Sequence, residues 1–147
     1  MPTPVTPLVG VDVFVLDAES RVLLIRRTDN GLWATPGGYQ DLGETPRECG
    51  VREVFEETGF EVRVTRLLGV FSSQRYQSVN SPWKDREITH VLFEGEVAGG
   101  TARTSEESSE VEWFARDGLP PLSDGHAQRI GVGFDAHGDP SLAPHFE

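Results

Sequence analysis

The chain has 147 residues, of which 37% are hydrophobic and 25% are charged, a composition that predicts a single folded domain and not a disordered chain. Its formal net charge of -11 argues against general binding to nucleic acid or to an anionic membrane, because both need a basic surface. No apolar run is long enough to span a bilayer, the first residues lack a secretory signal pattern, and Cys49 has no second cysteine to pair with, which together favour a cytoplasmic location.

The first residues of the domain predict paired strands. Apolar runs at 9–16 and 22–27 are separated by the turn residues 17–20, a pattern typical of a β-hairpin. A short strand is predicted at 32–34. The Gly37-Gly38 pair then marks a loop in which the backbone can adopt positive φ.

The next segment predicts a helix with a defined start and end. Thr45 can act as its N-cap, Pro46 suits the first helical position, and Glu48 completes a capping box. Gly59 suits the residue that ends the helix. The apolar residues at helical spacing are expected to face the core, and they are Val51, Val54, Phe55 and Thr58.

The rest of the chain predicts further strands and one more helix. Ser123 is expected to cap a helix over 126–130, and residues 1–134 are expected to form the domain, with a loosely ordered tail at 135–147. Interleaved strands and helices predict a mixed sheet covered by helices. The strands are expected at 62–72, 88–97 and 110–115, with a long polar loop at 74–85.

Three glutamates on the first predicted helix give the strongest indication of function. Glu53, Glu56 and Glu57 are spaced i, i+3 and i+4, so a helix would place them on one face. Like charges repel there, and a bound divalent cation such as magnesium removes the repulsion because hard cations take oxygen ligands. The structural alternative is a solvated helix face on which Arg52 forms ion pairs.

The run from 38 to 60 resembles the Nudix box, in which Gly, five residues, Glu and seven residues precede Arg-Glu-apolar-X-Glu-Glu-X-Gly-apolar. Every defining position is filled, in order, by Gly38, Glu44, Arg52, Glu53, Val54, Glu56, Glu57, Gly59 and Phe60. The resemblance implies an α/β protein, a Nudix-type α/β/α sandwich around a mixed β-sheet. It also implies an enzyme that hydrolyses the diphosphate bond of a nucleoside diphosphate linked to another moiety.

The resemblance also assigns roles to residues of the box. It implies Mg²⁺ as the cofactor, with Mn²⁺ as the alternative, and Arg52 would orient the carboxylates through bidentate hydrogen bonds. Glu44 would either interact with the helix N-terminus or fix the geometry of the box. The implied metal ligands are Glu56 and Glu57 as principal ligands, Glu53, and the carbonyl of Gly38.

Outside the box the candidate residues are less sharply defined. The general base is either a box glutamate or Glu107 in the acidic loop before the last strand, with Glu106 and Glu110 as substitutes. Arg26 and Arg27 end a strand and are candidates for binding substrate phosphate, although alternation along a strand lets only one point inward.

Two aromatic residues are candidates for substrate binding. Trp33 would either stack on a base or lie in the core. Tyr76 lies where some members of the family that act on diadenosine polyphosphates carry a tyrosine. Homodimers are common among similar proteins, but no segment of the sequence identifies an interface.

The predicted reaction is therefore magnesium-dependent hydrolysis of a small nucleotide-derived substrate. ADP-ribose, another nucleotide sugar or alcohol, and a dinucleoside polyphosphate all fit the pattern. The alternative is a nucleoside triphosphate pyrophosphohydrolase on the same scaffold. A non-catalytic module that senses a nucleotide is a third hypothesis, and degenerate box glutamates would have been its mark.

Overall fold

Strands and two α-helices make up the regular structure of the computed structural model, which describes residues 6–73 and 87–147. The predicted polar loop at 74–85, which contains Tyr76, lies outside the described residues. The helices are α1 (Pro46–Thr58) and α2 (His126–Gly138), with a short 3-10 turn, η2 (Arg116–Gly118). The strands are β1 (Leu8–Val15), β2 (Val22–Arg27), β3 (Trp33–Ala34), β4 (Gly37–Tyr39), β5 (Phe60–Ser72), β6 (Ile88–Gly100), β7 (Ser108–Phe114) and β8 (His145–Phe146).

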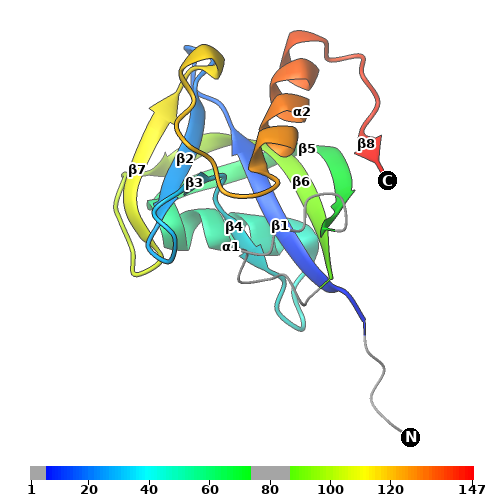
Figure 1. Cartoon of the computed structure of the whole chain (residues 1–147), viewed down its shortest axis with the longest axis horizontal. Coiled ribbons are helices and arrows are strands. Elements are labelled where there is room, and N and C mark those ends of the chain that lie inside the picture. The colour runs from blue at the N-terminus through cyan, green and yellow to red at the C-terminus, as the bar shows by residue number, and fades with distance from the viewer. Residues whose placement is uncertain (1–5, 74–86) are drawn as a thin grey trace, which may run out of the picture.

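The strands form one mixed sheet and one smaller antiparallel sheet. The larger sheet has the order β4-β1-β6-β5-β8, in which β1 runs parallel to β6 and antiparallel to β4. The smaller sheet has the order β3-β2-β7. The helices α1 and α2 lie on opposite sides of the larger sheet (Figure 1). The predicted α/β/α sandwich is therefore confirmed, and neither described helix is long and apolar enough to cross a membrane.

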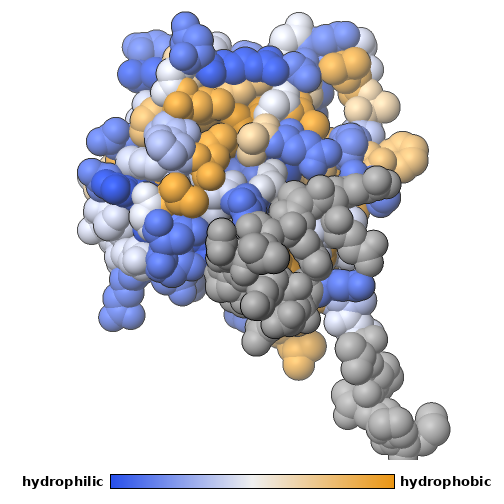
Figure 2. Space-filling model, in the orientation of Figure 1, coloured by the Kyte–Doolittle hydropathy of each residue, from blue (hydrophilic) through white to orange (hydrophobic). Residues whose placement is uncertain are grey.

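Alternation along β1 separates the core into two layers. Val13 and Val15 pack with Val54 of α1 on one face of the sheet. Phe14 points to the other face, where it packs with Phe134 of α2. Because successive side chains of a strand point to opposite faces, one central strand anchors both helices. On the face seen in Figure 2, apolar residues gather between β7 and α2.

The predicted boundaries of α1 are confirmed in detail. The hydroxyl of Thr45 accepts from the Glu48 N–H at 3.1 Å, and the Glu48 carboxylate accepts from the Thr45 N–H at 3.0 Å. Gly59 has a φ of +80° and ends the helix. The expectation that Phe55 faces the core is wrong, because its side chain is 39% exposed and lies under the guanidinium of Arg103.

The predicted hairpin between the first two strands is also wrong. A bridge joins Leu16 to Val22, but β1 pairs with β4 and β6, while β2 pairs with β3 and β7. The turn residues between the strands therefore carry the chain from one sheet to the other. The parallel pairing of β1 with β6 is a long-range contact that local turn residues do not reveal.

The C-terminal residues differ from the prediction of a loosely ordered tail. The N-cap of helix α2 is Gly125, with a φ of +82°, and not the expected Ser123. The helix continues to Gly138. The strand β8 then pairs in parallel with β5, and the ring of His145 stacks on Phe71 with 4.7 Å between centroids. These backbone and ring contacts order the end of the chain.

Candidate active site

Two of the three predicted carboxylates are buried between α1 and β4. Glu57 is 4% exposed, and its Oε1 accepts a hydrogen bond from the N–H of Gly37 at 2.9 Å. Glu53 is 9% exposed and lies against Gly38. Glu56 is exposed and accepts from the Arg52 guanidinium at 3.2 Å. A solvated helix face is therefore excluded for Glu53 and Glu57, whereas it describes Glu56.

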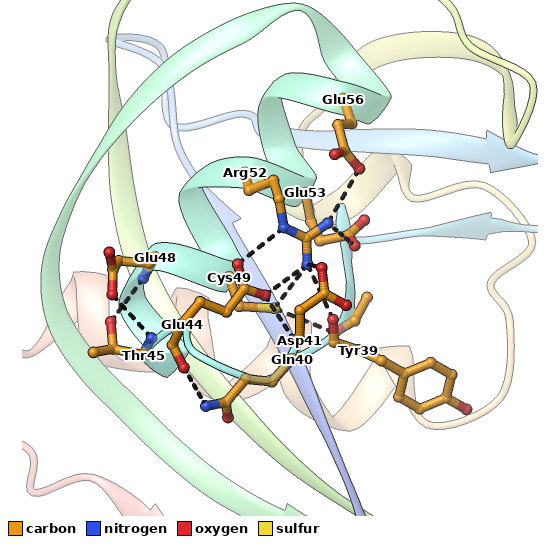
Figure 3. Close-up of polar contacts among 11 residues, drawn as sticks. Tyr39, Gln40, Asp41, Glu44, Thr45, Glu48, Cys49, Arg52, Glu53 and Glu56 are labelled. Atoms are coloured by element: carbon orange, nitrogen blue, oxygen red, sulfur yellow. Dashed lines mark hydrogen bonds and ion pairs between the residues drawn. The ribbon is translucent and has the colours of Figure 1, made fainter.

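Arg52 connects the loop of the box to the helix, as Figure 3 shows. Its Nε and Nη2 donate to the two carboxylate oxygens of Glu44 at 3.0 and 2.7 Å, a bidentate pair. Its Nη1 donates to Glu53 at 2.7 Å, and Nη2 donates to the carbonyl of Tyr39 at 3.1 Å. The hydrogen bond from Arg52 lowers the pKa of Glu44 to about 2. The orienting role that the resemblance implies for Arg52 agrees with these contacts.

Burial dominates the electrostatics of the two inner carboxylates. Burial raises the pKa of Glu57 well above its ordinary value, although the N–H of Gly37 works in the opposite direction. Burial also raises the pKa of Glu53, and Arg52 opposes that rise. Two carboxylates that are desolvated next to each other favour a bound cation, because a cation relieves both the burial cost and their mutual repulsion.

The oxygen atoms gathered here fit a hard divalent cation. Glu53 and Glu57 of α1 lie against Gly38 and Gly37 of β4, and Mg²⁺ prefers such oxygen donors. The carbonyl of Gly38 accepts from the Sγ of Cys49 at 3.7 Å. Within residues 6–73 and 87–147, no three Asp, Glu, His or Cys side chains converge closely enough to form a metal cluster. Glu56 instead turns toward Arg52, so the predicted set of three carboxylates is brought together only in part.

The glycines of β4 let the strand approach α1 closely. A Cβ at Gly38 would lie 2.5 Å from the carboxyl carbon of Glu53. A Cβ at Gly37 would lie 2.2 Å from the carbonyl oxygen of Val11, a backbone atom of β1 that cannot turn away. The absence of a side chain at Gly38 therefore leaves room for the carboxylate of Glu53. At Gly37 it leaves room for the backbone of β1.

Substitution of Gly38 by alanine is expected to lower activity by about 10- to 100-fold and to leave the chain folded, because the new methyl group displaces only the flexible end of Glu53. Substitution of Gly37 by alanine is the matched comparison. It should destabilise the protein, because its methyl group meets backbone. Thermal unfolding and hydrolysis rates measure both effects. Full activity of the Gly38→Ala variant would contradict the assigned position of Glu53.

Of the two arginines at the end of β2, Arg27 is the one that faces the box. Its guanidinium is held by both carboxylate oxygens of Asp29, at 2.9 and 2.6 Å. The hydrogen bond to Asp29 raises the pKa of Arg27, and the charge of Glu57 adds to that rise. Arg26 points the other way and pairs with Glu110 at 3.2 Å. This split follows from the alternation along the strand.

The acidic loop before β7 lies close to the end of α1. The hydroxyl of Ser108 donates to the backbone carbonyl of Glu57 at 2.6 Å, which anchors the loop there. The negative charge of Glu107 raises the pKa of both Glu53 and Glu57, which places it within electrostatic reach of the pair. Glu110, the other substitute for the base, forms an ion pair with Arg26.

Of the two interpretations of Trp33, stacking on a base or lying in the core, its surroundings fit the second. The side chain is 8% exposed and belongs to the core on the α2 side. Its ring meets that of Phe114 edge-on, with 4.9 Å between the centroids. Trp33 is therefore a core residue, and Tyr76 is outside the described residues.

Sequence reasoning missed a buried polar network on the opposite face of β1. Asp12 lies 2.8 Å from the Nε of Arg129, which comes from α2, and 3.8 Å from the Nδ1 of His90 on β6. Arg129 also contacts His126 through Nη2 and Nε2 at 3.2 Å. The spacing of His126 and Arg129, three residues apart on a predicted helix, was the available signal.

The burial of His90 predicts a loss of stability below neutral pH. Burial lowers the pKa of His90 to about 4, with a further contribution from Arg129, while Asp12 opposes it. Between pH 6.5 and 4 the unfolded chain therefore binds this proton more readily than the folded one. The free energy of unfolding should be unaffected by this group above pH 6.5 and should fall by about 2 kcal/mol at pH 5.

Denaturant unfolding at pH 7.5 and at pH 5 measures that loss. A His90→Asn variant is expected to lose less stability between the two pH values than the wild type. A change at the exposed His137, made in the same way, controls for the removal of an imidazole. Equal losses in the wild type and in His90→Asn would show that His90 does not cause the effect.

Comparison with known proteins assigns the chain to a family. The α/β/α fold and the complete box are those of a pyrophosphohydrolase, and the model of the NUDIX domain matches residues 6–131. The chain therefore belongs to the Nudix hydrolase family, as the box indicated.

The chain is similar to several named proteins. It is 41% identical over 113 residues to a MutT-like protein of Streptomyces ambofaciens, a match that covers 76% of this chain and 67% of that protein. It is 36% identical over 129 residues to an ADP-ribose pyrophosphatase of Methanocaldococcus jannaschii, covering 84% and 71%. Among solved structures, a UDP-X diphosphatase superimposes with a TM-score of 0.85 at 28% identity, covering 99% of this chain and 70% of that one.

Proposed function

We propose that this Nudix enzyme cleaves the diphosphate linkage of a nucleoside diphosphate derivative, with ADP-ribose or another nucleotide sugar as the substrate class, and that it depends on Mg²⁺. The observation that carries the proposal is the pair of buried carboxylates, Glu53 and Glu57, which face the glycines of β4. The printed activities of two similar proteins, ADP-ribose pyrophosphatase and UDP-X diphosphatase, support this substrate class.

In this proposal the box residues hold the cation, and neighbouring elements hold the substrate. Glu53, Glu57 and the carbonyl of Gly38 would be the ligands, and Arg52 keeps Glu53 in position through its 2.7 Å hydrogen bond. Bound magnesium would neutralise charge on the diphosphate and make a coordinated water more acidic. Glu56, which is exposed and paired with Arg52, is available to turn toward the same site.

Two flanking residues complete the proposed mechanism. Arg27 binds phosphate oxygens, because it is the arginine of β2 on the box side and Asp29 fixes its guanidinium. Glu107 accepts a proton from the attacking water, because its loop is anchored to the end of α1 and is exposed. Attack in line with the leaving oxygen requires the water and its base to lie on the side of the phosphorus opposite that oxygen.

A substrate panel with product identification tests the proposal. The purified protein, with magnesium, is incubated with ADP-ribose, UDP-sugars, diadenosine polyphosphates and nucleoside triphosphates, and products are identified by mass spectrometry. Release of a nucleoside monophosphate from a diphosphate-linked substrate is the expected result. Pyrophosphate released from triphosphates as the preferred reaction would favour a triphosphate pyrophosphohydrolase instead, and tight binding without any product would favour a nucleotide sensor.

A further inference from the structure

We propose that a buried polar chain reaching from α2 through His126 to Thr35 positions β4 against the carboxylates of α1, so that His126 and Thr35 are positioning residues for the metal site without touching it. The inference rests on the proposed function, because it takes Glu53 and Glu57 as ligands of the cation.

The segment 33–38 lies between the two helices and is held on the α1 side at its end. The N–H of Gly37 donates to Glu57 at 2.9 Å, and Gly38 leaves room for the carboxylate of Glu53. The carbonyl of Pro36 accepts from the Val13 N–H at 3.1 Å, which ties the segment to β1. The position of this backbone therefore sets where the two carboxylates lie.

The α2 side holds the same segment two residues earlier. The residues that lead into α2 run alongside it: the N–H of Trp33 donates to the Pro121 carbonyl at 3.0 Å, and the N–H of Ser123 donates to the Trp33 carbonyl at 2.8 Å. At the start of the helix, the Nδ1 of His126 lies 3.0 Å from the hydroxyl oxygen of Thr35 and 3.2 Å from its backbone nitrogen. Through this contact His126 holds α2 to a residue that is only two positions before Gly37.

The imidazole of His126 is held by Arg129, which in turn contacts β1, the strand that pairs with β4. Arg129 lies 3.2 Å from the Nε2 of His126 and 2.8 Å from the carboxylate of Asp12, and all three side chains are buried. Asp12 is the register partner of Gly37 in the pairing of β1 with β4. A guanidinium can only donate, so Nε2 accepts from Arg129, and the ring hydrogen is then on Nδ1, which donates to the hydroxyl oxygen of Thr35.

A network that only stabilised the core would change the folding equilibrium alone. A network that positions β4 should also change cation affinity and kcat, while the KM of the substrate stays nearly unchanged. Polar groups that orient metal ligands from outside typically alter affinity or activity by about 10- to 100-fold. Both properties can be measured on the whole protein.

The test uses binding of Mn²⁺, followed by electron paramagnetic resonance of the free ion, together with the kinetics. Thr35→Val replaces the hydroxyl by a methyl group of similar shape, and it is expected to weaken Mn²⁺ binding about 10-fold and to lower kcat. Thr35→Ser, which restores the hydroxyl, should recover both. Ile130→Val is the control, because it loosens the packing of α2 without touching the network, and it should bind Mn²⁺ like the wild type.

A second variant protects the test against misfolding. His126→Asn keeps a polar group near the position of Nδ1, and it should bind Mn²⁺ more tightly than His126→Leu. Wild-type affinity in Thr35→Val, or equal affinities in the two His126 variants, would overturn the inference. Absence of Mn²⁺ binding by the wild-type protein would overturn the proposed function, and this inference with it. The wild-type measurement therefore distinguishes a failure of the proposed function from a failure of the inference alone.

Discussion

Replacing Glu57 by glutamine is expected to lower the rate of hydrolysis by about two to three orders of magnitude, because the cation loses a charged ligand worth several kcal/mol in the transition state. The variant should remain folded. The amide oxygen can still accept from the N–H of Gly37, and the substitution removes a charge from a buried position. Single-turnover kinetics and thermal unfolding without metal measure the two parts of the expectation.

Glu48→Gln provides the matched control for that experiment. Glu48 lies on the same helix, and a glutamine at this position preserves the capping box. Its activity should therefore stay within about two-fold of the wild type, since surface substitutions of this kind change little. Full activity in Glu57→Gln would refute its assignment as a metal ligand.

Replacing Glu107 by glutamine is expected to lower kcat by about 100-fold or more, because a positioned general base contributes about 10²–10⁴-fold to the rate. The KM of the substrate and the affinity for Mg²⁺ should change little. Initial rates over a range of substrate and magnesium concentrations measure these quantities.

Glu106→Gln is the control for Glu107, because it removes the neighbouring carboxylate of the same loop. The charge of Glu107 acts on both Glu53 and Glu57. We therefore expect Glu106→Gln to retain most of the activity. If the Glu106 variant lost activity and the Glu107 variant did not, the base would have been assigned to the wrong residue.

The box region was well predicted because its signals are local. Capping by Thr45 and Glu48 depends on residues three apart, and the αL conformation at Gly59 depends on one residue type. The spacing of Glu53 and Glu57 placed them on one helix face, but it did not reveal that this face is covered by β4. Burial depends on what the rest of the chain brings to the helix, which periodicity within the helix does not contain.

The errors concern contacts between segments that are far apart in the sequence. Residues with strong turn propensity suggested that β1 and β2 form a hairpin, whereas the pairing of β1 with β6 separates them into two sheets. Asp12 and Arg129 are likewise isolated in the sequence and meet only because α2 packs on the far face of β1. For Trp33 the residue type left open whether it stacks on a base or lies in the core, and only the packing on the α2 side decides for the core.

The central claim is that Glu53 and Glu57 hold a divalent cation against β4. Diffraction from crystals of the protein soaked in Mn²⁺, collected at the manganese absorption edge, tests it most directly. An anomalous peak is expected within coordinating distance of both carboxylates and of the Gly38 carbonyl. Strong peaks elsewhere with none at this position, at a manganese concentration that supports hydrolysis, would contradict it.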